Sequence, residues 1–440
     1  MADSTPQEYQ NLVFYQIFVR NHTPQSTFTA LEADLPRIRS MGVDVLHLLP
    51  VYPIGKPNRK GTLGSPYSIS DYRAINPEYG TLADFQHFLA QAHEQGMRVM
   101  LDVVFNHTAH DSLLVQDHPD WFHQNPQGKP VTTVPEWSDV IDLKYPNPAL
   151  ERYLIDTLLF WVGMGVDGFR CDVASLVPLT FWVKARVELE RVNPALIWLA
   201  ESVHAGFVTS RRANGLRAHS DGELFQAFDI CYDYDIWPVQ VQAMTGQIPV
   251  SDFLDLLQFQ SALYPANAHK LRYVENHDQN RVMAVIPAPP RALAWTGLQA
   301  FNQGPFLIYA GQESGARIRP SLFDAEPVMW GQFEHQPLLT RLTALKKHPA
   351  QQHGRLVFST AEPAVTAYWL NGKNSLCGIF NISGAAGNIP VHAADGEVKD
   401  LVTDELFRVE HGQIPIPDSL CIFQCDLSTG SPSEYASRLM

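Results

Sequence analysis

Short apolar runs alternate with longer segments of helical period over the first 350 residues of the chain. In the longer segments, apolar residues recur three and four positions apart, which is the spacing of one helix face. Several of these segments begin with Thr, Ser or Asn, residues that cap helix N-termini. Strands are expected at 13–20, 43–51, 98–105, 165–174, 197–202, 224–232, 271–276 and 305–311. Helices are expected at 29–41, 81–95, 148–164, 179–192, 210–214, 251–263, 291–303 and 338–347.

This alternation predicts an α/β fold, because parallel strands need a crossover connection and a helix usually supplies it. Eight such units indicate a (β/α)8 TIM barrel over residues 1–350. Residues 108–146 lack helical period, and a connection this long predicts a small subdomain inserted after the third strand. Residues 351–440 carry short alternating runs between turn residues, which predicts a C-terminal antiparallel β-domain with a frayed end at 428–440.

The composition and net charge make some classes of binding partner unfavourable. Hydrophobic residues make up 45% and charged residues 18% of the 440 positions, which is typical of a globular protein. The formal net charge of −14 opposes binding to nucleic acid or to an anionic membrane. Five cysteines, an odd number, do not indicate a disulfide framework, and the polar N-terminus does not have the pattern of a secretion signal. We therefore expect a cytoplasmic protein; its oligomeric state stays open.

The segment Gly168-Phe169-Arg170-Cys171-Asp172 places an arginine and a carboxylate two positions apart at the end of an apolar strand. Strand side chains alternate between faces, so Arg170 and Asp172 should point the same way. A neighbouring guanidinium lowers the pKa of a carboxyl group, which favours an ionised Asp172 acting as a nucleophile or as a stabiliser of positive charge. Taken alone, the pair is better explained as a structural ion pair.

Other strand ends carry carboxylates and histidines as well. The third strand ends in Asp102-Val103-Val104-Phe105-Asn106-His107, the fifth in Glu201, and the seventh in Glu275-Asn276-His277-Asp278. In a TIM barrel these ends form the catalytic face. Several carboxylates without a reactive cysteine, a phosphate loop or a zinc set favour glycoside cleavage, which uses one carboxylic acid and one carboxylate. Glu201 follows an apolar run that should raise its pKa, so it is the candidate acid, with Asp172 as the nucleophile.

These regions, Asp102–His107, Gly168–Asp172, Glu201 and Glu275–Asp278, resemble in order and spacing those of the α-amylase superfamily, glycoside hydrolase family 13. The resemblance implies a retaining enzyme with Asp172 as nucleophile, Glu201 as general acid/base and Asp278 as transition-state stabiliser. It also implies a set of substrate-binding residues: Tyr67, Asp102, His107, Arg170, His277 and Arg281. A retaining mechanism further implies that the two catalytic carboxyl groups lie about 5 Å apart.

Two features depart from the pattern of the family. Asn106 matches a calcium ligand of many members, but Ser175-Leu176 stands where typical α-amylases carry Lys-His. Gly64 stands where exo-acting relatives have an aspartate that accompanies the arginine matched by Arg281. No cofactor is expected to be required, and calcium at Asn106 is left open.

Three functions follow from the sequence. The first is hydrolysis of α-glucosidic linkages in maltooligosaccharides or related α-glucans. The second is transglycosylation or isomerisation of short α-glucosides, because a covalent intermediate can be captured by a sugar hydroxyl instead of water. The third is a non-catalytic binding subunit, which is disfavoured because all three catalytic carboxylates are present. Linkage preference and endo or exo action are not specified.

Overall fold

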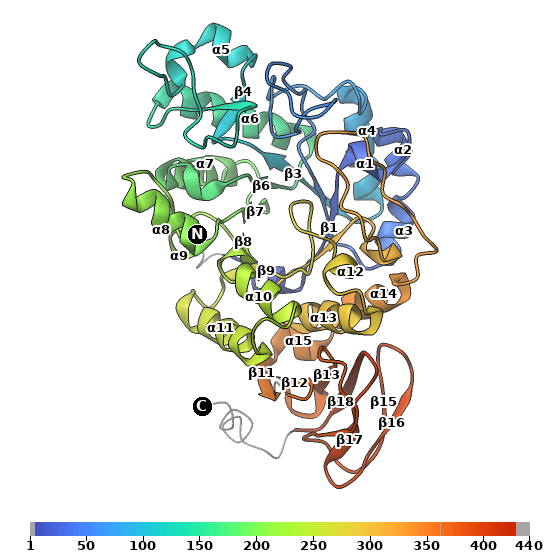
Figure 1. Ribbon diagram of the computed structural model, residues 1–440. Helices are drawn as coiled ribbons and strands as arrows, with labels where there is room; N and C mark the ends of the chain where they lie inside the picture. The colour runs from blue at the N-terminus through green and yellow to red at the C-terminus, as the bar shows by residue number, and fades with distance from the viewer. Residues whose placement is uncertain (1–4, 361, 428–440) are drawn as a thin grey trace.

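The computed structural model describes residues 5–360 and 362–427. Within this part of the chain, eight parallel strands form a barrel surrounded by helices, with antiparallel sheets at one end of the molecule (Figure 1). The barrel strands are β1 Val13–Ile17, β2 Val45–Leu48, β3 Arg98–Val103, β6 Gly168–Cys171, β7 Ile197–Ala200, β8 Ile230–Tyr232, β9 His269–Leu271 and β10 Phe306–Tyr309. They pair in the order β10-β1-β2-β3-β6-β7-β8-β9, and a parallel bridge between Arg272 and Phe306 closes the ring. The predicted TIM barrel is confirmed.

The barrel strands are shorter than predicted, and the sixth and seventh differ most from their expected ranges. The sixth begins only at Ile230, because a capping box between Ser220 and Glu223 starts a short helix in the preceding segment. The seventh ends at Leu271, whereas the predicted strand extended to position 276. Glu275 lies in the irregular chain beyond it and accepts hydrogen bonds from Arg281 and from the backbone N–H of Val282 instead of joining the sheet.

Most of the predicted helices are present near their expected positions, and the structure adds α1, α9, α10, α12 and α15, which were not predicted. They are α1 Val19–His22, α2 Phe28–Glu32, α3 Leu35–Ser40, α4 Leu82–Glu94, α6 Pro148–Met164, α7 Leu179–Glu190, α8 Ala205–Ala213, α9 Asp221–Leu224, α10 Trp237–Met244, α11 Val250–Leu263, α12 Val282–Val285, α13 Pro289–Phe301, α14 Gln336–Leu345 and α15 Pro349–His353. The predicted helix at 29–41 is divided into α2 and α3, since Pro36 near the start of α3 has no N–H to continue the ladder. Asn147 caps the first turn of α6, and Gly165 ends that helix at φ +107°.

The chain after β3 makes the predicted excursion away from the barrel. It contains β4 His107–Ala109, α5 Leu113–Asp117 and β5 Val140–Asp142, with β4 antiparallel to β5. Figure 1 shows this part in cyan beyond the end of the barrel strands, next to α6 and α7. The pairing returns the chain from Asp142 to His107, so the excursion begins and ends beside the carboxyl end of β3.

The C-terminal part of the described chain is antiparallel, as predicted. One sheet has the order β11-β12-β13-β18, formed by Arg355–Thr360, Val365–Leu370, Ser375–Phe380 and Leu420–Cys425. Two further ribbons, which the sequence did not reveal, pair β14 Asn388–Pro390 with β17 Gln413–Pro415 and β15 Gly396–Lys399 with β16 Leu406–Val409. The five cysteines are buried and free. The predicted frayed end at 428–440 lies outside the described residues.

Apolar side chains fill both layers of the barrel. An inner cluster contains Phe14, Val45, Met100, Leu199 and Leu307 from five strands. A larger cluster lies between the strands and the surrounding helices. This packing holds the strand ends in fixed register, which determines where the carboxylates of the site lie. In the described part of the chain, every helix is too short or too polar to serve as a membrane span.

Candidate active site

The register of neighbouring strands places Asp172 beside Glu201. Cys171 in β6 pairs with Ala200 in β7, so the next residues of the two strands are neighbours at the same level. The N–H of Glu201 donates to the carbonyl of Cys171 over 3.0 Å, which extends the pairing by one step. Adjacent strands lie about 4.8 Å apart, so both carboxyl groups leave the same rim of the barrel close together.

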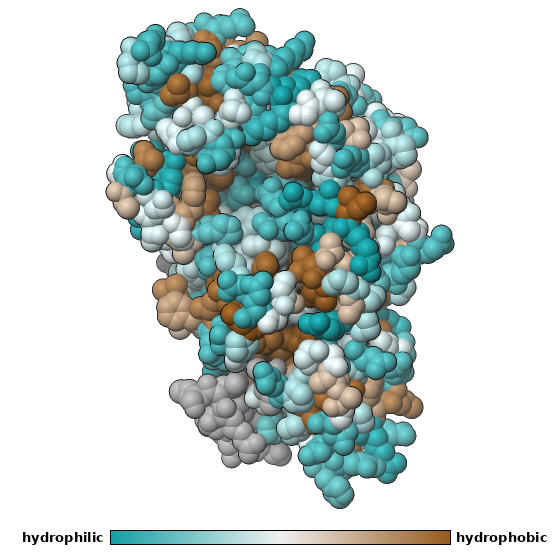
Figure 2. Space-filling model, in the orientation of Figure 1, coloured by the Kyte–Doolittle hydropathy of each residue, from teal (hydrophilic) through white to brown (hydrophobic). Residues whose placement is uncertain are grey.

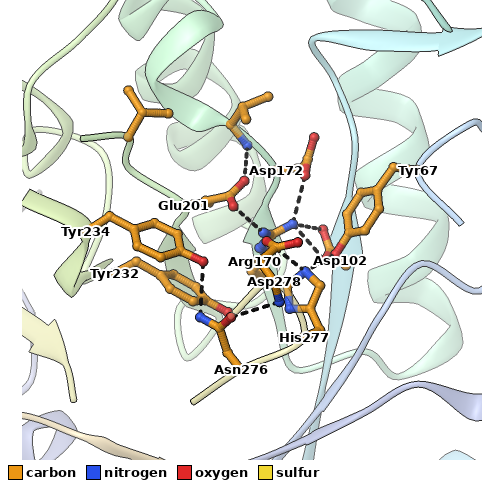
Figure 3. Close-up of polar contacts among 12 residues, drawn as sticks. Tyr67, Asp102, Arg170, Asp172, Glu201, Tyr232, Tyr234, Asn276, His277 and Asp278 are labelled. Carbon is orange, nitrogen blue, oxygen red and sulfur yellow. Dashed lines mark hydrogen bonds and ion pairs between the residues drawn. The ribbon is translucent and has the colours of Figure 1, made fainter. Parts of the chain in front are cut away.

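Arg170 lies below this rim and connects three carboxylates (Figure 3). Its Nη1 donates to both oxygens of Asp102, over 2.8 and 2.7 Å, and to Oδ1 of Asp172 over 3.0 Å. Its Nη2 lies 2.8 Å from Oε1 of Glu201. The prediction that Arg170 and Asp172 face the same way is confirmed, and the guanidinium is fully buried.

The charges around this guanidinium correct one expectation from the sequence. Burial and the negative charge of Glu201 raise the pKa of Asp172 well above its usual value, against the lowering by Arg170. Burial raises the pKa of Glu201 to about 7, also against Arg170. Asp102 lies deeper, and Arg170 lowers its pKa despite its burial. One guanidinium neutralised by Asp102 cannot keep two further carboxylates ionised, so Asp172 and Glu201 together hold a proton near pH 7.

The backbone at Val173 also positions Glu201. The N–H of Val173 donates to Oε2 of Glu201 over 2.7 Å. Val173 adopts a left-handed conformation with φ +34°, which is rare for a β-branched residue. Such a conformation costs on the order of 1–3 kcal/mol and is found where a functional site maintains it. The strain directs the N–H that follows Asp172 toward the candidate acid.

A pocket of about 240 Å³ lies above these carboxylates. Its polar lining is formed by Lys60, Ser65, Tyr67, His107, Asp139, Asp172, Glu201 and Asp278. In the space-filling view the surface is hollowed between the excursion and the loops opposite it, and the rim is mainly hydrophilic (Figure 2). The three predicted catalytic carboxylates therefore share one pocket with two of the predicted substrate-binding residues, Tyr67 and His107.

Tyr67 and His277 form one face of the site. The hydroxyl of Tyr67 donates to Oδ2 of Asp102 over 3.0 Å and lies 2.6 Å from Nε2 of His277, and the two rings are stacked. Nε2 of His277 is also 3.2 Å from Oδ2 of Asp278. Burial lowers the pKa of His277 to about 4, so the imidazole is neutral near pH 7. Asp278 has the most exposed side chain of the three carboxylates, at 38%, and points into the open pocket.

His107 lies on the excursion side of the pocket. Its Nε2 is 3.8 Å from Oδ2 of Asp172, and its ring packs against Trp137 with centroids 5.2 Å apart. Burial lowers the pKa of His107 to about 4. A neutral imidazole beside Asp172 can exchange hydrogen bonds with a ligand without adding charge to the site.

Sequence reasoning missed the residues that hold this arrangement from below. Gln16 Oε1 accepts the backbone N–H of His277 over 3.0 Å, while its Nε2 lies 3.3 Å from His47 Nδ1 and donates to the Tyr232 hydroxyl over 3.3 Å. Asn276 Oδ1 accepts the backbone N–H of Asp278 over 2.9 Å. A polar side chain inside an apolar strand, such as Gln16 in β1, is the sequence signal that could have revealed this layer.

Four of the six predicted substrate-binding residues, Asp102, Arg170, His277 and Arg281, are fully buried and do not line the pocket. Asp102 is fully buried beneath Arg170, so its placement is that of a positioning residue. Arg281 is also fully buried: it binds Oε1 of Glu275 over 2.7 Å and the carbonyl of Ala310 over 2.8 Å, and it stacks on Tyr309. The prediction of a substrate clamp at Arg281 is therefore wrong, because the guanidinium is used within the fold.

Replacing Arg281 by glutamine should therefore lower stability more than substrate binding. It would leave Glu275 buried without its cation, which costs on the order of 3–5 kcal/mol, whereas the pair Arg281→Met with Glu275→Gln should recover much of that loss. Urea unfolding measures the free energy of unfolding, and KM is measured on the folded fraction. A 100-fold rise in KM at unchanged stability would contradict this assignment.

The aromatic residues of the excursion separate into two groups. Trp121 is buried and stacks on His118, and the Tyr145 hydroxyl donates to the carbonyl of Phe105 over 2.6 Å, so both belong to the core. Trp137 lies at the pocket and is half-buried. It is the one member of the three that is placed to contact a ligand.

Some of the oxygen donors near Asn106 are engaged within the protein, but Oδ1 of Asp142 is buried without a hydrogen-bond partner among the described residues. The carbonyl of Asn106 accepts the N–H of Leu143, and its Nδ2 is 3.2 Å from Nδ1 of His107. Lys60 places an ammonium 2.9 Å from Oδ1 of Asp139. Within the described residues, no three His, Cys, Asp or Glu side chains are grouped so as to hold a metal ion. The ammonium of Lys60 neutralises Asp139, whereas Oδ1 of Asp142 is not used by another group of the described chain, so calcium at Asn106 stays open.

Comparison with known proteins supports the same family. Residues 27–139 match the family described as "Alpha amylase, catalytic domain", and residues 359–423 match "Bacterial Alpha amylase C-terminal domain". A crystal structure of an alpha-amylase from Lactobacillus plantarum is 40% identical, with a TM-score of 0.91, over 95% of this chain and 99% of that one. That of a noncanonic maltogenic alpha-amylase from Thermotoga neapolitana is 31% identical, with a TM-score of 0.85, over 96% and 100%.

A relative from Streptomyces coelicolor carries a different activity in its name. It is called alpha-1,4-glucan:maltose-1-phosphate maltosyltransferase 2, and it is 31% identical over 92% of this chain and 63% of its own length. The chain thus spans less than two thirds of this curated relative, and 45% of an alpha-amylase from Haloarcula japonica that is 27% identical over 70% of this chain. The match to the Lactobacillus plantarum enzyme extends over nearly the full length of both chains. The chain belongs to the α-amylase family, glycoside hydrolase family 13.

Proposed function

We propose that the protein hydrolyses α-glucosidic linkages of maltooligosaccharides or related α-glucans through a covalent glycosyl-enzyme. One observation carries the proposal: Asp172 and Glu201 follow neighbouring strands in register, contact the same guanidinium and line one pocket with Asp278. Retaining glycosidases need such a closely spaced pair of carboxyl groups. The similar structures are named alpha-amylases, which supports an α-glucan as the substrate.

In the first step, the Glu201 carboxyl donates its proton to the glycosidic oxygen as the bond from that oxygen to the anomeric carbon breaks. A carboxylate oxygen of Asp172 forms the new bond to the anomeric carbon, giving a glycosyl ester and a free sugar as leaving group. Asp278 stabilises the positive charge that develops on the sugar ring, and its exposed carboxylate can bind the sugar hydroxyls.

In the second step, Glu201 acts as the base. Its carboxylate accepts a proton from a water molecule whose oxygen attacks the anomeric carbon, and the bond to Asp172 breaks. Two inversions at one carbon retain its configuration. Both steps use only side chains of the pocket, and neither needs a metal ion.

Transfer to a sugar is the second candidate, favoured by the name of the Streptomyces coelicolor relative. The first step is then the same, but a sugar or phosphate oxygen replaces water as the acceptor in the second. The residues of the pocket activate either acceptor through Glu201.

Maltotriose distinguishes these outcomes. We expect the first product observed by ¹H NMR to be the α-anomer, because a double displacement retains configuration. Hydrolysis should give glucose and maltose as the early products, with isomaltose and sucrose as control substrates. Products longer than maltotriose would favour transfer, and an initial β-anomer would contradict the covalent mechanism.

A further inference from the structure

Two segments of the chain lie over one side of the pocket. The first follows β2 and contains Lys60 and Ser65, and the second follows β10 and contains Leu322 and Phe323; all four residues line the pocket. Figure 1 shows the second segment in orange beside the blue chain on one side of the barrel, with α8 on the other side. We call these two segments, residues 55–66 and 316–330, the wall.

Hydrogen bonds join the two segments directly. The backbone N–H groups of Leu63 and Gly64 both donate to the carbonyl of Phe323, over 2.9 and 3.1 Å. Oδ1 of Asp324 accepts from the backbone N–H of Thr62 over 2.8 Å and from its hydroxyl over 2.7 Å. We call this set of hydrogen bonds the joint. It fixes the backbone of Phe323, and therefore the position of its side chain at the pocket.

Buried residues of α1 anchor the joint to the barrel. Nη1 of Arg20 donates to the carbonyls of Gly64 and Leu322, over 2.9 and 3.2 Å, and this guanidinium is 1% exposed. Nδ2 of Asn21 donates to the carbonyl of Ser321 over 2.8 Å. One charged and one polar side chain thus hold both segments, which makes the wall a rigid part of the fold.

The wall continues into the excursion. Nζ of Lys60 lies 2.9 Å from Oδ1 of Asp139 and donates to the carbonyl of Glu136 over 3.0 Å. The backbone N–H of Lys56 donates to Oδ2 of Asp111 over 3.1 Å. The second segment also contacts the loop that carries Asp278, because the guanidinium of Arg319 binds the backbone carbonyl of that residue.

The side of the pocket nearest the candidate acid is different. There the half-exposed apolar side chains of Val173, Val203 and Phe207 lie together with Trp137. They pack against a small hydrophobic cluster that is separate from the barrel core. In Figure 3, Glu201 and Tyr67 lie on opposite sides of Arg170. Because the acid protonates the leaving oxygen, the leaving sugar must lie on the side of Glu201. The wall then faces the sugar that becomes attached to the enzyme.

We propose that the wall, with Phe323 at its centre, prevents a glucan chain from extending beyond the attached sugar, so that the enzyme acts only at non-reducing chain ends. This inference rests on the glycosidase activity proposed above. The pocket has a volume of about 240 Å³, and Phe323 lines it on the side of the wall. One fixed product, a single glucosyl unit, follows.

The test uses maltoheptaose carrying a fluorophore at its reducing end, with and without an ethylidene group that blocks the non-reducing end. We expect the full-length protein to shorten the free substrate by one fixed step at a time, and to cleave the blocked substrate at least about 100-fold more slowly. Labelled products of many lengths from the start, or equal rates on both substrates, would overturn the inference while leaving the glycosidase proposal intact. Cleavage of neither substrate would overturn both.

Two variants test the wall itself. Phe323→Ala removes a side chain that lines the pocket. Asp324→Ala removes the hydrogen bonds from Thr62 that join the two segments of the wall, and Asp324 itself does not line the pocket. We expect each to raise the rate ratio of blocked to free substrate by about tenfold or more. Phe259→Ala on α11, whose ring is exposed, and Asp156→Ala on α6 are the matched controls and should keep the wild-type ratio. If both wall variants kept the wild-type ratio of blocked to free substrate, the wall would not be what prevents a longer chain from binding.

Discussion

Replacing Asp172 by asparagine is expected to lower kcat/KM on maltooligosaccharides by about 10⁴-fold or more, because groups that form the covalent bond have effects of this size. The substitution keeps the shape of the side chain and an oxygen that can accept from Arg170, which lies 3.0 Å away in the native site. The amide cannot form the glycosyl ester, so the first step fails. Initial rates measured on maltotriose give the result.

The same substitution should not destabilise the fold. The pKa of Asp172 is raised, chiefly by burial, so the ionised form is disfavoured in the folded state and stability falls as pH rises from the unfolded toward the folded pKa. Asparagine carries no such charge, and at pH 7 the variant should unfold at the same temperature as the wild type or at a higher one. A non-catalytic binding subunit would have no turnover that depends on Asp172. A variant that is inactive and as stable as the wild type would therefore exclude that function.

Asp404→Asn is the matched control for this variant. Asp404 is an exposed carboxylate of the C-terminal part, paired with Arg341 and Lys399, and it adopts φ +64°, which asparagine accommodates. We expect wild-type activity from it. A comparable loss of activity in both variants would contradict a specific role for Asp172.

The sequence was sufficient to predict the barrel and its three carboxylates because both depend on local patterns. The apolar runs mark strands, and the last residues of strands in a TIM barrel meet at one rim. Asp172 and Glu201 each follow their strand directly, so a small error in strand length did not displace them. Asp278 was placed equally well, although its strand ends seven residues earlier, at Leu271.

Long-range contacts were beyond the reach of these patterns. The sequence argument considered Arg170 with Asp172 alone, whereas the fold adds Asp102 and Glu201 to the same guanidinium, and the direction of the Asp172 pKa shift changes as a result. Arg281 was misplaced for a similar reason. Its position three residues after Asp278 suggested a ligand contact, while its partner is Glu275 on the buried side of the same turn.

The wall, which we propose determines specificity, could not be predicted from local sequence patterns either. Phe323 follows β10 and Thr62 follows β2, and no local pattern connects segments about 260 positions apart in the sequence. Even Gly64, which weakened an exo-acting role when compared with relatives, lies in the joint and donates to Phe323. Closing a pocket at the chain end can therefore be achieved by backbone contacts as well as by a charged clamp.

Glu201→Gln should produce an effect that depends on the leaving group. On maltotriose, which needs protonation of the leaving oxygen, kcat/KM should fall by about 10²–10⁴-fold, the usual contribution of a general acid. On 2,4-dinitrophenyl α-glucoside the leaving phenolate needs no proton, so the first step should proceed at nearly the wild-type rate. Release of dinitrophenol should then show a burst, because the second step has lost its base.

The pH dependence provides an independent check of the same residue. The raised pKa of Glu201, about 7, means that its proton is present below that pH and lost above it, so wild-type kcat/KM on maltotriose should fall as pH rises through about 7. Glutamine cannot lose a proton, and this alkaline limb should disappear in the variant. Glu188→Gln, on the surface of α7 and paired with Arg152, should keep the wild-type profile.

Azide completes the assignment. It attacks without giving up a proton, so it should restore turnover of the dinitrophenyl substrate by Glu201→Gln and yield the α-glucosyl azide after two inversions. With Asp172→Asn, azide can only displace the leaving group directly, so any azide product should have the β configuration. Those two responses separate the base from the nucleophile, although both carboxyl groups contact Arg170. An α-configured azide from the Asp172 variant would instead mean that the roles of the two carboxyl groups are exchanged, with Asp172 as the acid and Glu201 as the nucleophile.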